Sequence, residues 1–182
     1  MSNPKSLTRI QTGNATVDRT LENWRSILDP ALKSLYSPAY GEIWDGFAFD
    51  GSGLSLTIVA GGLYYKLPGL VLNISDGSNV VFGESSLKIA REGSGVYKVL
   101  FFVAFAGPSE TIASVIFKNG TEISPIHSSS KINSNQDEQT MSASGLIRLN
   151  AGDEIDLRLS STNNNKVLTM DHVGVTISRI GP

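Results

Sequence analysis

The feature that most constrains this chain is a run of seven consecutive apolar residues, from Val99 to Phe105. Side chains alternate between the two faces of a strand, so Leu100, Phe102 and Ala104 share one face and the remaining four share the other. A strand in an antiparallel sheet with one solvated side is expected to be apolar on one face only. This strand needs a cover on both faces, and a second copy of the chain is the simplest source of the second cover. The run therefore predicts an oligomeric β-protein.

From Tyr40 onwards, short runs of alternating apolar and polar residues are separated by turn signals, a pattern typical of antiparallel β-structure. Asn119-Gly120 lies between two apolar runs and predicts a tight hairpin, because both residues tolerate positive φ. From Glu154 to Leu159, apolar residues are expected to face inward, with Glu154, Asp156 and Arg158 outward. About nine or ten such strands without a convincing helix predict a mainly β protein, an antiparallel β-sandwich or jelly roll.

Two polar segments, His127 to Gln139 and Ser161 to Lys166, are predicted to be loops between strands. The last strand is expected at Val173–Ile177, close to the C-terminus. Polar loops on a rigid scaffold often carry binding residues. The candidates for such contacts in the two loops are His127, Lys131, Asn133, Asn163, Asn164 and Lys166.

The N-terminal part has a different pattern. Residues 1–13 are polar and predict an extended arm, and apolar residues then recur at spacings of three and four, as in the seam of a coiled coil. Asp29-Pro30 interrupts this seam and predicts the start of a second short helix. Two interpretations stay open: an amphipathic helix packed on its own domain, or a self-associating or docking helix. The seam consists of Val17, Leu21, Trp24, Leu28 and Leu35, and the predicted division of the chain is 1–38 for this segment and 39–182 for the β-domain.

Composition excludes several classes of protein. The chain has 182 residues, no cysteine and a formal net charge of -2, which argues against disulfides, thiolate metal sites and a general nucleic-acid binder. No apolar run approaches the roughly 20 residues of a membrane-spanning helix. Residues Met1 to Lys5 lack the apolar centre of a secretory signal, so we expect synthesis in the cytoplasm and release by another route, such as within a virus particle.

No catalytic constellation is evident in the sequence. The two histidines, His127 and His172, are far apart and lack a third ligand, so no metal or other cofactor is predicted. The Asp50-Gly51 and Asp76-Gly77 segments are better explained as turns than as calcium loops. A hydrolase on this scaffold would need acidic or histidine side chains clustered on one sheet face, and the alternating strands offer none. We expect the chain not to be an enzyme.

Several segments carry a resemblance to a known family. The strand Gly95-Val96-Tyr97-Lys98-Val99, the hairpin Phe117–Thr121, the segment Gly145–Ile155 and the closing strand Val173–Ile177 stand in the order found in C1q/TNF-like jelly rolls. The resemblance covers roughly residues 86–180. The resemblance implies a homotrimer with three jelly rolls around a three-fold axis. Its candidate interface residues are Leu100, Phe102, Ala104 and His172.

The N-terminal segment from Thr16 to Leu35 resembles helical leaders of small structural proteins of tailed bacteriophages. The chain lacks a collagen-like repeat and a membrane anchor, which favours a virion component over a signalling ligand. The expected function is that of a trimeric short fibre, spike or decoration protein, docked to capsid or tail proteins by its N-terminus. The exposed jelly roll would contact a glycan or protein of the host surface, with no nucleic acid bound and no membrane insertion. The alternative is a free trimeric carbohydrate- or receptor-binding module of bacterial origin.

Overall fold

The structure is a computed structural model that describes residues 19–28, 39–45, 53–77, 79–134 and 137–182. The chain divides into two compact units, residues 1–37 and residues 38–182. In the first unit, residues 19–28 form a helix on which Leu21, Trp24 and Leu28 are exposed. Val17, Leu35 and the predicted break at Pro30 lie outside the described residues. No helix in the described part of the chain is long and apolar enough to span a membrane.

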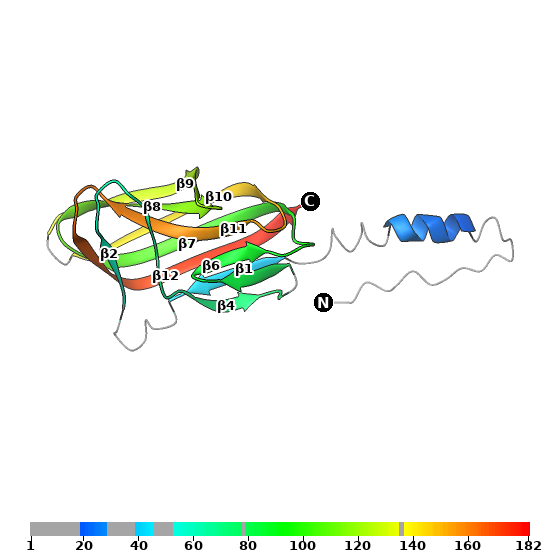
Figure 1. Ribbon diagram of the computed structural model, residues 1–182, viewed down its shortest axis with the longest axis horizontal. Coiled ribbons are helices and arrows are strands. Elements are labelled where there is room, and N and C mark those ends of the chain that lie inside the picture. Colours follow the sequence, from blue (N-terminus) through cyan, green and yellow to red (C-terminus); the bar gives the residue numbers. More distant parts are fainter. Residues whose placement is uncertain (1–18, 29–38, 46–52, 78, 135–136) are drawn as a thin grey trace. The chain divides into compact units, whose positions relative to one another are not determined.

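The described part of the second unit contains twelve strands (Figure 1). Their bounds are β1 (Tyr40–Trp44), β2 (Leu54–Ile58), β3 (Tyr65–Lys66), β4 (Val71–Ser75), β5 (Val80–Gly83), β6 (Ser86–Ile89), β7 (Gly95–Ala106), β8 (Glu110–Lys118), β9 (Thr121–Ile132), β10 (Gln139–Leu149), β11 (Glu154–Ser161) and β12 (Lys166–Gly181).

The strands form two antiparallel sheets that pack face to face. Sheet A has the order β10-β7-β12-β1-β4, with β2 beside the first part of β12. Sheet B has the order β5-β6-β11-β8-β9, with β3 beside β11. Non-consecutive strands are neighbours in both sheets, as in a jelly roll. The predicted fold class, a mainly β antiparallel sandwich with a short N-terminal helix, is confirmed.

The core lies between the two sheets and contains one face of β7. Val99, Phe101, Val103 and Phe105 are all fully buried there, together with residues from sheet B such as Ile116. The alternation expected from the apolar run is therefore present, with every second side chain in the core. The Asn119-Gly120 hairpin is also confirmed, because both residues have positive φ, 51° and 78°, between β8 and β9.

Two sequence predictions were wrong in their bounds. The predicted loop His127 to Gln139 is strand as far as Ile132, because residues 127–132 pair with β8. This part of β9 is polar since β9 is an edge strand of sheet B, where Pro125 is also tolerated. The last strand is longer than Val173–Ile177, because β2 pairs with its first residues and β7 with nearly all the rest.

Candidate functional site

The outer face of sheet A carries large apolar side chains. Leu100 and Phe102 of β7 are 40% and 39% exposed, whereas their neighbours Phe101 and Val103 are fully buried. Directly paired residues share a face of a sheet, so the pairing registers show which other side chains lie beside them. We call this surface the apolar face, and its members are Trp44, Ile74, Leu100, Phe102, Ala104 and Leu146.

The apolar face extends across five strands. Leu146 of β10 pairs with Lys98 of β7 and is 62% exposed. On the other side of β7, Gly174 of β12 pairs with Phe102 and also with Trp44 of β1. Ile74 of β4 lies at the far edge of the sheet and is exposed. Polar side chains (Ser142, Ser144 and Thr176) and two charged side chains (Glu42 and Lys98) lie between these apolar groups on the same face.

Phe102 lies over the backbone of β12. A Cβ atom added to Gly174 would be 2.3 Å from Cε1 and 2.6 Å from Cζ of the Phe102 ring. The ring therefore occupies space that any other residue at position 174 would need. Gly174 allows the ring to lie close to the sheet, which flattens the centre of the apolar face.

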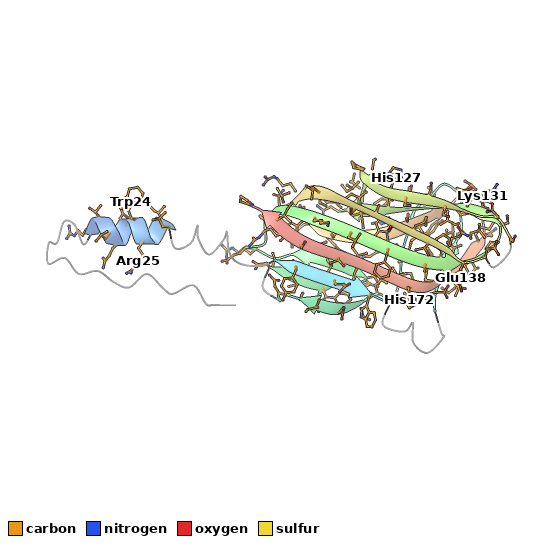
Figure 2. All side chains as sticks on the ribbon, turned by 180° about the vertical axis from the view of Figure 1, so that it is seen from behind. Trp24, Arg25, His127, Lys131, Glu138 and His172 are labelled. Atoms are coloured by element: carbon orange, nitrogen blue, oxygen red, sulfur yellow. The ribbon has the colours of Figure 1, made fainter. Side chains whose placement is uncertain are left out.

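His172 lies at the same side of sheet A, opposite Ala104 in the register and exposed to solvent (Figure 2). Near it, Asp45 is buried at the end of β1, and its Oδ2 has no hydrogen-bond partner among the described residues. Burial raises the pKa of Asp45, while the backbone of Val173 and the charge of His172 act in the opposite direction. The four predicted interface residues thus share one face, and their role in association stays a prediction.

The second predicted loop is held by a buried carboxylate. Glu110 of β8 is 5% exposed and accepts hydrogen bonds from the side chains of Thr162 and Asn163, the latter at 2.6 Å. Lys166 Nζ lies 3.8 Å from the same carboxylate. Burial by itself would raise the pKa of Glu110, but these hydrogen bonds and the lysine outweigh it and lower the pKa. Two of the predicted contact residues, Asn163 and Lys166, therefore stabilise the turn.

The remaining predicted contact residues are exposed at separate places. Asn164 accepts a hydrogen bond from the backbone of Gly61 at 2.7 Å. His127 and Lys131 lie on strand β9 rather than in a loop, and Asn133 follows its end. No group of three or more His, Asp or Glu side chains that could hold a metal ion occurs in the described ranges.

A polar hollow on sheet B was missed by the sequence analysis. Its volume is about 340 Å³, and we call it the charged hollow; its lining residues are Lys66, Lys88, Asn119, Gly120, Gly152, Glu154, Asp156 and Arg158. The sequence showed that Glu154, Asp156 and Arg158 face outward. It gave no signal that two lysines from other strands would lie beside them, because that depends on the order of the strands.

Comparison with known proteins shows the fold. No family model matches this sequence, and no curated protein matches it. Among solved structures, the chain is similar to Eiger TNF from S. frugiperda, with 11% identity over 79% of this chain and 94% of that chain and a TM-score of 0.59. It is similar to murine APRIL, with 10% identity, coverage of 79% and 100%, and a TM-score of 0.55.

A third similar structure is the PRD1 vertex protein P5, with 13% identity over 79% of this chain and 97% of that chain and a TM-score of 0.51. At these identities the likeness is one of fold. The chain therefore has a TNF-like jelly-roll fold, the class indicated by the resemblance of its strands.

Proposed function

We propose that this chain is a structural component of a tailed-bacteriophage virion: a homotrimeric short fibre, spike or decoration protein. Three jelly rolls associate through the apolar face, and the N-terminal segment docks to capsid or tail proteins. The exposed jelly roll contacts a glycan or protein of the host surface. The observation that carries the proposal is the apolar face itself. Four large apolar side chains of this face, Ile74, Leu100, Phe102 and Leu146, are exposed, and such groups gathered on one sheet face favour a surface that binds something.

Buried area on the apolar face would stabilise the assembly. Burial of its apolar part stabilises association by about 25 cal/mol per Å².

Structures of similar fold support the proposal. A phage vertex protein is among the structures of similar fold, so this fold occurs in at least one component of a virus particle. The TNF-like fold supports the trimer as the expected assembly. The proposal includes no enzymatic activity and no contact with nucleic acid or membrane, and it places the protein in the virion after synthesis in the host cytoplasm.

The mass of the purified protein tests the trimer. Light scattering at micromolar concentration should give three times the chain mass of 19.5 kDa. A stable monomer with the apolar face in water would contradict the proposal. Labelling of native particles with an antibody against the chain tests the virion assignment, and particles without the protein would contradict it.

A free carbohydrate- or receptor-binding module is the second candidate function. The charged hollow favours it, because a binding role needs a polar site that the assembly leaves open. Removal of residues 1–37 distinguishes the two candidates. A virion protein loses its incorporation into particles without that segment, whereas a free binding module keeps its ligand affinity.

A further inference from the structure

The charged hollow lies on the outer face of sheet B, the sheet that does not carry the apolar face. Ile155, Leu157 and Leu159 of β11 are fully buried in the core. The residues between and before them, Glu154, Asp156 and Arg158, therefore point to the other side of the sheet. A trimer formed through sheet A leaves this side in solvent.

Cations from three strands meet in the hollow. Lys88 of β6 is opposite Glu154 in the register, and Lys66 of β3 is opposite Arg158. The Asn119-Gly120 turn and the turn containing Gly152 complete the rim. With three cations and two carboxylates among its lining residues, the hollow carries a net charge of +1.

Glu154 neutralises the two lysines only in part. Lys66 Nζ is 3.4 Å from Glu154 Oε1, and Lys88 Nζ is 3.5 Å from Oε2. Both distances exceed the roughly 2.7–2.9 Å of a strong ammonium–carboxylate hydrogen bond. Each ammonium group has three donors, and one carboxylate is shared between the two groups. Donors therefore remain for a ligand oxygen.

Arg158 is held in place before any ligand arrives. Its Nε and Nη2 donate to the two oxygens of Asp156 at 2.6 Å and 3.2 Å, and Asp156 is 4% exposed. Its guanidinium carbon lies 4.2 Å from the centre of the Phe117 ring, which Tyr64 contacts edge-on. A guanidinium fixed in this way loses little conformational entropy on binding.

We propose that the charged hollow binds an acidic saccharide, that is, a sugar unit that carries a carboxylate. The ligand carboxylate is held by Lys66 and Lys88, and the sugar hydroxyls bond to Glu154 and to the guanidinium of Arg158. The proposal deepens the proposed function, since it names the class of host-surface glycan, and it rests on sheet B being exposed in the assembly.

The mixture of donors and acceptors favours a sugar over a simple anion. Hydroxyl groups both donate and accept hydrogen bonds, so a sugar can donate to the carboxylates and accept from the lysine and arginine side chains. An inorganic phosphate needs donors, and the two carboxylates of the hollow repel its multiple charge. The volume of about 340 Å³ is at the lower end of the range of about 300–1,000 Å³ for small-ligand sites.

The test uses the full-length chain, D-glucuronate as the probe and D-glucose as its uncharged match. Calorimetric titration at low salt should show that glucuronate binds at least about tenfold more tightly than glucose, because a charged hydrogen bond is lost with the carboxylate. The Lys66→Gln and Lys88→Gln double variant should lose this preference. Arg91→Gln removes one positive charge from an exposed turn residue that does not line the hollow, and it should leave the preference unchanged.

Equal binding of glucuronate and glucose overturns the proposal, as does a preference that survives in the double variant. Competition by inorganic phosphate at the same concentration as glucuronate assigns the hollow to simple anions and also overturns it. If the double variant unfolds, Lys88→Gln alone serves, since this side chain is about half exposed. Light scattering on the same samples distinguishes the two proposals. A trimer that does not bind glucuronate contradicts only the saccharide site, and a monomer that binds glucuronate contradicts only the trimer.

Discussion

At the scale of single residues, Glu110 shows how one buried carboxylate can hold a turn. It bonds the side chains of Thr162 and Asn163 and the backbone N–H of Thr111, and it lies near Lys166. Thr162 and Asn163 come from the turn between β11 and β12, 52 and 53 residues further along the chain. The turn is therefore fixed by a contact that is remote in sequence.

Substitution of Glu110 by Gln should destabilise the protein by about 2 kcal/mol at neutral pH, because hydrogen bonds to a charged acceptor are replaced by weaker ones. Since folding lowers the pKa of Glu110 from 4.5, its stabilisation is present above pH 4.5 and is lost as the pH falls through the folded-state value. Urea unfolding at neutral and acidic pH measures both effects. The variant should lose less stability on acidification than the native chain.

Glu138→Gln is the matched control for this prediction, because Glu138 is exposed. It should leave the stability near its native value at both pH values. If Glu110→Gln proved as harmless as the control at neutral pH, the carboxylate would not hold the turn as described.

Gly174 is the second residue with a testable role. Gly174→Ala places a Cβ where the Phe102 ring now lies, so the ring must move away from the sheet. Overpacking of this kind costs about 1–3 kcal/mol, and the displaced ring should also weaken association. Gly181→Ala on the same strand is the control, because its added Cβ meets its nearest neighbour, Val96 Cβ, at 3.8 Å. Thermal unfolding and light scattering of both variants measure the difference, and equal behaviour would count against a close fit at Phe102.

At the scale of the element, β7 separates two kinds of apolar side chain. Phe101 points into the core and Phe102 points to the apolar face, although they are adjacent in sequence. Alternation along one strand thus places one residue in the core and the next on the outer surface of sheet A.

Substitution at these two positions should have different outcomes. Phe101→Ala leaves a cavity in the core and should cost about 3–5 kcal/mol of folding stability. Phe102→Ser should leave each jelly roll folded and convert the assembly to monomers, since it removes the centre of the apolar face. Denaturant unfolding and light scattering check the two outcomes. A Phe102→Ser variant that stays trimeric would move the interface elsewhere on the molecule.

Strand β9 shows where element prediction from the sequence failed. Its residues from His127 to Lys131 are all polar, so their pattern predicts a loop where the structure has an edge strand. Their strand conformation follows from the backbone pairing with β8, which the side chains do not reveal. The Asn119-Gly120 turn was predictable, because its conformation depends on the two residues themselves.

At the scale of the whole molecule, the two units are predicted to have separate tasks. Every buried apolar residue of the described core lies at position 39 or later. A chain without residues 1–37 should therefore keep its melting temperature within a few degrees and keep the trimeric mass of the jelly roll. Its incorporation into particles should be lost. Loss of the trimer on this deletion would assign trimerisation to the helical seam instead of the apolar face.

The sequence by itself determined what depends on neighbouring residues: the β-class, the alternation along β7, the outward side chains of β11 and the hairpin at Asn119-Gly120. These features follow from the two-residue period of a strand and from local backbone preferences. The tertiary structure alone decided which strands are neighbours. It placed Trp44 and Ile74 on the same sheet face as Phe102, brought Lys66 and Lys88 into one hollow with Arg158, and bonded Glu110 to Thr162 and Asn163. Strand order is set by packing between segments distant in the chain, and no short pattern of residues encodes it.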